Sequence, residues 1–157
     1  MKRIVSILFL VLILGDTGHG QSYYVKSESN PRDGSASVYM VNNFITPQLE
    51  LSAGIIRSPN GSNVYLLTSH YSGYDRFSAH SLRLSVDGEV VTVNEIVNIR
   101  RRPNSEIVAF RISEDQFTKL GNAQKIRIYL RGNWSIEKEM DEENVQRFRD
   151  FYHTHMR

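Results

Sequence analysis

Residues 81–112, SLRLSVDGEVVTVNEIVNIRRRPNSEIVAFRI, decide the fold of this chain. Apolar and polar residues alternate through most of the stretch, and a period of two is typical of strands that bury one face. Asp87-Gly88 interrupts the first half and Pro103-Asn104 the second. Dipeptides of this kind form tight turns. The stretch therefore predicts two consecutive antiparallel hairpins.

The strand register follows from counting outward from the two turns. Each turn places apolar residues opposite apolar residues, while most arginines of the stretch fall on the other face. The predicted pairs are Leu84 with Val91, Leu82 with Val93, Ile99 with Val108, and Val97 with Phe110. A slip of one residue would turn the arginines inward, so turn chemistry and apolar pattern support the same register.

The remaining segments extend this pattern. Residues 35–42, 48–57 and 64–71 alternate in the same way, and Asn60-Gly61 predicts a hairpin turn between the last two. Ser113 and Gln116 form a capping-box pattern that starts a short helix, and residues 125–132 form a further strand. Residues 140–157 predict an amphipathic helix. We expect a mainly β protein: one antiparallel β-sandwich of roughly seven to nine strands in meander hairpins, with one short helix and a C-terminal amphipathic helix.

The start of the chain has the pattern of an export leader. Lys2 and Arg3 precede the apolar run Ile4–Leu14, and small residues follow it. Such a run is too short to span a bilayer of about 30 Å. We therefore interpret residues 1–20 as a cleaved signal peptide. An uncleaved N-terminal anchor is the alternative. We expect a flexible lead-in over 21–34, a single domain over 35–157, no transmembrane segment in the mature chain, and a periplasmic or secreted protein of a bacterial type.

Charge and cysteine content exclude several classes of protein. The full chain has a net charge of +2, and the loss of Lys2, Arg3 and Asp16 with the leader would leave +1. This near-neutral balance lacks the basic excess of nucleic-acid-binding domains, so we expect no nucleic-acid partner. The chain has no cysteine. It therefore has neither a disulfide scaffold nor thiol chemistry.

Residues 67–80, LTSHYSGYDRFSAH, contain the side chains most suited to chemistry. A hairpin loop centred on Asp75 would place His70 directly opposite His80 on the inner face of the sheet. Cross-strand neighbours have Cβ atoms about 5 Å apart, so both imidazoles could hold one metal ion. A catalytic zinc normally has three protein ligands, and no third is evident. The alternative is that both rings close the end of the sandwich through hydrogen bonds.

Two further groups of residues are candidates for ligand contact. Tyr71, Tyr74 and Phe77 flank Gly73, where they would form either an exposed binding tip or a lid folded back on the core. Arginines on outward-facing strand positions could form a positive sheet face that meets an anionic surface component. A solvated face balanced by acidic residues is the alternative. The arginine candidates for this face are Arg83, Arg111 and Arg127, together with Arg100, Arg102 and Arg131.

Segments 81–89, 105–132 and 144–152 carry a resemblance. Their order, a V-D-G hairpin, a strand leading into a short helix, a basic strand and a terminal helix, resembles that of small uncharacterised exported bacterial β-sandwich proteins. The resemblance covers about half of the chain and implies the fold and an exported location. It brings no catalytic or binding motif. The matching residues are Asp87, Gly88, Phe110, Leu120, Ala123, Gly132 and Phe148.

No nucleophile motif such as G-x-S-x-G is present, so we predict no catalytic residues and no cofactor. The leading hypothesis is a non-enzymatic binding or assembly module of the cell envelope. Its partner would be another envelope protein or an anionic surface component. The alternative is a small metal-assisted or acid/base enzyme centred on His70 and His80. A third hypothesis is a modulator of a secreted enzyme that acts through the loop aromatics.

Overall fold

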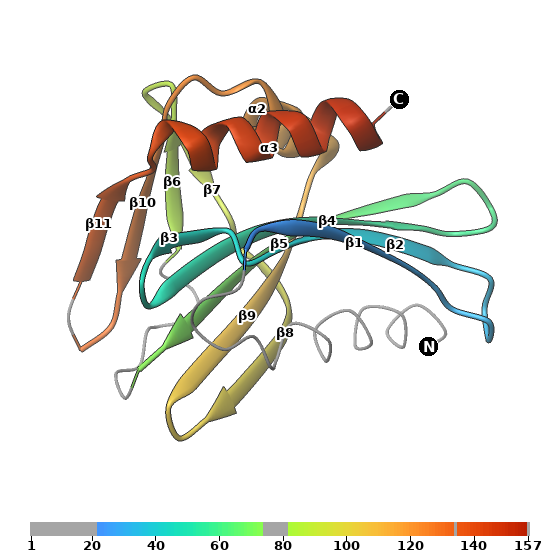
Figure 1. Cartoon of the computed structure of the whole chain (residues 1–157), viewed down its shortest axis with the longest axis horizontal. Helices are drawn as coiled ribbons and strands as arrows, with labels where there is room; N and C mark the ends of the chain where they lie inside the picture. Colours follow the sequence, from blue (N-terminus) through green and yellow to red (C-terminus); the bar gives the residue numbers. More distant parts are fainter. Residues whose placement is uncertain (1–21, 74–81, 134, 157) are drawn as a thin grey trace.

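The computed structural model describes residues 22–73, 82–133 and 135–156. These residues form two antiparallel sheets and two helices, which confirms the predicted mainly β sandwich. In Figure 1 the four-stranded sheet stands at the left of the view, and helix α3 lies above strands of the seven-stranded sheet.

The larger sheet has the strand order β1-β2-β4-β5-β9-β8, and the short strand β3 also pairs with β4. Asn60-Gly61 turns the chain between β4 and β5 as predicted, and Gly61 has a φ of 81°, which favours glycine. The strands are β1 (Tyr24–Ser29), β2 (Ala36–Val41), β3 (Phe44–Thr46), β4 (Leu49–Arg57), β5 (Asn63–Ser72), β8 (Glu95–Arg102) and β9 (Ser105–Ile112).

The smaller sheet has the order β11-β10-β6-β7. Its strands are β6 (Arg83–Val86), β7 (Glu89–Thr92), β10 (Ile126–Arg131) and β11 (Ser135–Glu139). The predicted turn at Asp87-Gly88 joins β6 to β7, and Leu84 pairs with Val91 as expected. In β10 the side chains of Ile126, Ile128 and Leu130 are buried, and those between them point outward.

The two described helices, α2 (Glu114–Asn122) and α3 (Glu142–His155), lie side by side. The capping box at the start of α2 is present, because the Ser113 side chain accepts a hydrogen bond from the backbone of Gln116 and the Gln116 side chain accepts one from Ser113. Gly121 permits the close approach of the helices, since an added Cβ would lie 2.1 Å from Cγ of Tyr152. Any larger residue would force them apart.

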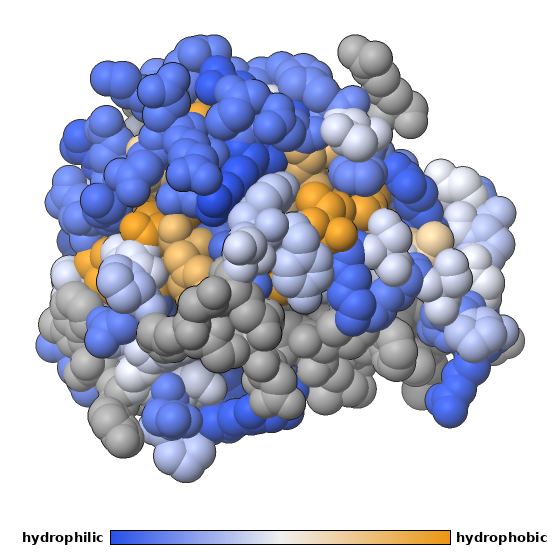
Figure 2. Space-filling model, viewed as in Figure 1, coloured by the Kyte–Doolittle hydropathy of each residue, from blue (hydrophilic) through white to orange (hydrophobic). Residues whose placement is uncertain are grey.

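The main core joins both sheets and both helices. Tyr65 of β5 stacks on Phe117 of α2 with ring centroids 5.0 Å apart, and Phe117 meets Phe151 of α3 edge to face. Val145, Phe148 and Phe151 form the buried side of α3. Figure 2 shows the opposite, hydrophilic side of this helix, with hydrophobic side chains visible between it and the strands below.

The described residues form eleven strands where roughly seven to nine were expected, and three further details of the fold prediction are wrong. Residues 24–29 were expected in a flexible lead-in, but they form β1, which pairs with β2 over its whole length. This edge strand carries Lys26, Ser27 and Glu28 and has no apolar alternation to reveal it. Val97 does not pair with Phe110, because a bulge between Ile96 and Asn98 moves Ile96 into that position. The third error is the predicted pairing of β5 with the strand that follows it, which is described with the candidate site below.

Candidate ligand-binding site

The predicted hairpin between His70 and His80 does not form. Strand β5 is bonded on one edge to β4 and on the other to β9, while the following strand β6 belongs to the smaller sheet. His70 therefore lies opposite Glu50 on β4 and Ile107 on β9. His80 falls outside the described residues. Within the described ranges no three His, Asp or Glu side chains gather closely enough to hold a metal ion.

His70 has a carboxylate neighbour that the sequence analysis missed. Oε2 of Glu50 lies 3.5 Å from Nδ1 of His70, and both residues are buried. Oε1 of Glu50 accepts hydrogen bonds from the backbone N–H of Asn42 at 2.8 Å and from Oγ of Ser52 at 2.7 Å. A buried carboxylate needs such donors to offset its lost hydration. Glu50 thus bonds to two donors, whereas Nδ1 of His70 has no hydrogen-bond partner among the described residues. The hydrogen-bonded closing role predicted for the two histidines stays a prediction.

The loop aromatics do not form an exposed tip as far as they are described. Tyr71 is 3% exposed and belongs to the main core. It follows His70 on β5 and therefore points to the opposite face of the sheet, toward the helices and the smaller sheet. Tyr74 and Phe77 lie outside the described residues, so their predicted contact role stays a prediction.

The three candidate arginines do not share one face. Arg83 on β6 and Arg127 on β10 point outward from the smaller sheet, and both are exposed. Arg111 on β9 belongs to the larger sheet, where it forms an ion pair with Glu95 at 2.8 Å. The prediction of a single positive face is therefore wrong. The strand alternation was correct, but it could not indicate to which sheet each strand belongs.

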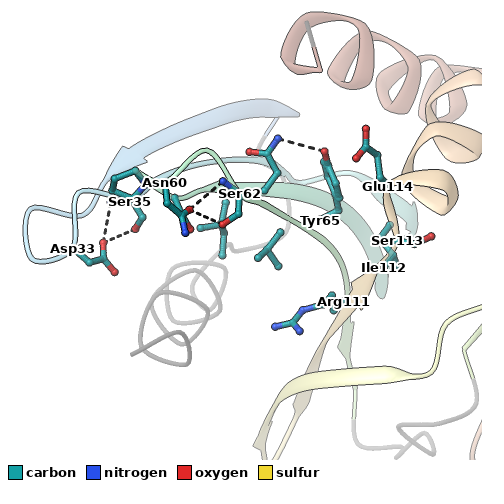
Figure 3. A pocket seen from close by; sticks show the side chains of 14 residues that line it. Asp33, Ser35, Asn60, Ser62, Tyr65, Arg111, Ile112, Ser113 and Glu114 are labelled. Atoms are coloured by element: carbon teal, nitrogen blue, oxygen red, sulfur yellow. Dashed lines mark hydrogen bonds between the residues drawn. The ribbon is translucent and has the colours of Figure 1, made fainter. Parts of the chain in front are cut away.

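One hollow of about 680 Å³ lies beside Arg111, at the end of the β4–β5 hairpin (Figure 3). Most of its polar groups are already bonded within their own turns. Asp33 accepts hydrogen bonds from Ser35, Asn60 accepts them from Ser62, and Asn63 donates one to Tyr65. Its charged residues are Arg111, Asp33 and Glu114, so acidic and basic groups offset one another. The polar groups here stabilise local structure and do not favour one class of ligand.

A second hollow, of about 490 Å³, lies on the outer face of the smaller sheet. Among the described residues its lining contains two arginines and no acidic residue, a charge balance that favours a negatively charged group. Arg83 and Ser85 have no side-chain hydrogen bond to any other residue in the described part of the chain. Val90 is 66% exposed and contributes an apolar wall. The lining residues are Arg83, Leu84, Ser85, Gly88, Val90, Tyr129 and Arg131.

Strand pairing brings these side chains together. Tyr129 on β10 lies directly opposite Arg83 on β6, and Arg131 follows two residues later on the same face of β10. Cross-strand neighbours have Cβ atoms about 5 Å apart, and diagonal neighbours about 7–8 Å. Long arginine side chains at these positions can reach one common ligand. We call Arg83, Tyr129 and Arg131 the outer-face triad.

Arg127 has a different role from the one predicted for it. Its guanidinium lies 3.1 Å from Glu139 and 3.6 Å from Glu137, both on the neighbouring strand β11. The nearby Tyr129 side chain, followed by Glu139, raises the pKa of Arg127. Two carboxylates thus offset the charge of Arg127.

Comparison with known proteins identifies no relative: no family model, no curated protein and no solved structure matches this chain. Within the described residues, neither helix has the length and apolar character that a membrane-spanning helix requires.

Proposed function

We propose that this chain is an exported, non-enzymatic binding module of the cell envelope, and that it holds an anionic ligand in the hollow of the outer-face triad. The observation that carries the proposal is the charge of this hollow: of the residues that the structure describes, Arg83 and Arg131 line it and no carboxylate does. Arginine forks bind anionic oxygen atoms through paired N–H groups. The hollow beside Arg111 lacks this charge asymmetry.

Export is the second part of the proposal. The basic residues Lys2 and Arg3, the apolar run Ile4–Leu14 and the following small residues support a cleaved leader and a periplasmic or secreted location. An anionic envelope component would then be within reach of the protein. A sheet face that projects away from the core and the helices suits a ligand that is part of a larger surface.

The test uses the full chain, expressed with its own leader in a Gram-negative host. We expect a shortened protein in the periplasmic fraction, with an N-terminus near Gln21 by mass spectrometry. Unshortened protein in the cytoplasm would contradict export.

The binding test compares retention of the recovered protein on isolated envelope fractions. We expect Arg83→Ala/Arg131→Ala to abolish most of the retention, because it removes both positive charges of the hollow. The control is Arg32→Ala/Lys125→Ala, which removes two positive charges from exposed positions elsewhere. Equal retention of the two double variants would show that general charge, and not this hollow, is responsible, and would overturn the binding proposal.

A further inference from the structure

We infer that the group bound by the outer-face triad is a phosphorylated sugar, with the phosphate between Arg83 and Arg131 and the sugar ring against Tyr129. This inference rests on the proposed function and names its ligand class. It follows from three features of the hollow: its two arginines, its half-buried aromatic ring and its volume.

The two arginines favour a phosphate over a carboxylate. A carboxylate has two oxygen atoms in one plane, and the fork of a single arginine satisfies both. A terminal phosphate has three oxygen atoms and close to two negative charges at neutral pH. Arg83 and Arg131 lie diagonally across β6 and β10, so their forks can approach one tetrahedral group from two sides.

Tyr129 favours a ring next to the phosphate. Its side chain is half-buried on the outer face of the smaller sheet, directly opposite Arg83. A tyrosine has only two side-chain torsion angles and loses little conformational entropy when a ring stacks on it. The exposed Val90 extends the apolar surface, and the Ser85 hydroxyl can bond to a sugar hydroxyl group.

The size of the hollow agrees with this ligand. About 490 Å³ lies within the range of roughly 300–1,000 Å³ that is typical of small-molecule sites. Inorganic phosphate would leave most of the hollow, including the Tyr129 and Val90 walls, without contact. A sugar phosphate can touch both arginines and the aromatic wall together.

The binding experiment is calorimetric titration of the processed protein with four probes: a hexose 6-phosphate, inorganic phosphate, the unmodified hexose and a hexuronate. We expect the hexose phosphate to bind at least roughly tenfold more tightly than each of the other three, since each lacks one charge-assisted or stacking contact. Equal affinity for hexuronate and hexose phosphate would overturn the phosphate assignment. Equal affinity for inorganic phosphate would overturn the ring assignment.

Variants locate the site. Arg83→Ala and Arg131→Ala should each weaken hexose phosphate binding by roughly tenfold or more, and Arg32→Ala should leave it unchanged. Tyr129→Ala should weaken binding of the hexose phosphate but not of inorganic phosphate. Far-ultraviolet circular dichroism verifies the fold of each variant, and Arg83→Gln replaces any alanine variant that does not fold. Unchanged binding in folded Arg83 and Arg131 variants would overturn the inference.

The inference and the proposed function can fail separately. If envelope retention depends on Arg83 and Arg131 but no hexose phosphate binds, the ligand class is wrong and the binding proposal stands. Two sources could supply a phosphorylated sugar: a surface polymer or a small soluble molecule. Phosphatase treatment of the envelope fraction should abolish retention if the ligand is part of the polymer. Binding of free hexose phosphate without retention on washed envelope fractions would instead indicate the soluble source.

Discussion

Oε2 of Glu50 lies 3.5 Å from Nδ1 of His70 across strands β4 and β5, in a part of the sheet that is closed to water. The Glu50 carboxylate also accepts hydrogen bonds from the Asn42 backbone and the Ser52 hydroxyl. One buried acidic group thus accepts hydrogen bonds from two separate positions along the chain and lies next to the ring of a third residue, His70. Removal of this group would leave its neighbours buried without an acceptor.

Glu50→Ala should therefore destabilise the protein strongly. A buried donor left without its acceptor costs about 1–3 kcal/mol. Glu50 is the acceptor for two donors, so we expect a loss of about 2–6 kcal/mol in urea unfolding. Ser52→Ala is the matched control, because it removes one donor and leaves the carboxylate in place. Its cost should be about 1 kcal/mol. Equal effects of the two substitutions would contradict the central role of Glu50.

Gly121→Ala should separate the two helices. The added Cβ would lie 2.1 Å from Cγ and 2.4 Å from Cβ of Tyr152, too near the α3 backbone for the ring to rotate away. Overpacking of this kind costs about 1–3 kcal/mol or more, measured as a lower urea midpoint. Asp115→Ala, on an exposed position of the same helix, should have little effect. A Gly121→Ala variant as stable as Asp115→Ala would mean that α2 and α3 do not pack this closely.

The pH dependence of stability should contain a contribution from Tyr39. Burial, followed by the charge of Glu28, raises the pKa of its phenol above the usual value. The folded state therefore holds this proton more firmly than the unfolded state does. The contribution is fully present below the unfolded pKa near 10 and is lost as pH rises above it.

The measurement is the difference in unfolding free energy between the parent and Tyr39→Phe, from about pH 8.5 to about pH 11.5. The value for the parent minus the value for Tyr39→Phe should fall as pH rises, because only the parent loses the Tyr39 contribution. Tyr24→Phe provides the control, since Tyr24 is 43% exposed. If the difference for Tyr39→Phe stays constant with pH, Tyr39 does not titrate with a shifted pKa.

Local features were predicted correctly from the sequence, whereas the pairing of strands distant in the chain was not. The turns at Asn60-Gly61 and Asp87-Gly88, the helix cap at Ser113 and the inward face of Ile126–Leu130 all depend on residues close together in the chain. Alternation indicates which way a side chain points, but it carries no information on the neighbouring strand. The pairing of β5 with β4 and β9 depends on the packing of the whole sheet. Because both edges of β5 are occupied, the predicted pairing of His70 with His80 was wrong.

The candidate site was predicted only in part, again because strand pairing could not be read from the sequence. The outward direction of Arg83, Arg127 and Arg131 followed from alternation alone. Their grouping did not, because residues 83 and 129 become neighbours only when β6 pairs with β10. The two strands are separated along the chain by β7, β8, β9 and α2. The sequence thus predicted which arginines point outward. It could not predict that Arg83, Tyr129 and Arg131 lie together, or that Arg111 lies on the other sheet.

Asp87 connects the β6–β7 turn to the loop that leads into β10. Its carboxylate accepts hydrogen bonds from the backbone N–H groups of Gln124, at 3.0 Å and 3.1 Å, and of Lys125, at 2.7 Å. Its φ of 50° lies in the left-handed region, which Asp and Asn tolerate better than other residues with a Cβ. Asp87 therefore fixes the β6–β7 turn against the start of the strand that carries Tyr129 and Arg131.

Asp87→Ala should lower the unfolding free energy by about 2 kcal/mol, because it removes both hydrogen bonds and strains the turn. Asp87→Asn keeps one acceptor oxygen and the left-handed preference, and its cost should be below about 1 kcal/mol. Amide hydrogen exchange gives a local measurement: the Lys125 N–H should exchange faster in Asp87→Ala than in Asp87→Asn. Equal exchange at Lys125 in both variants would mean that the carboxylate does not protect this amide. The turn would then owe its position to the backbone hydrogen bond from Asp87 N–H to the Lys125 carbonyl and to the pairing of Val86 with Ile126.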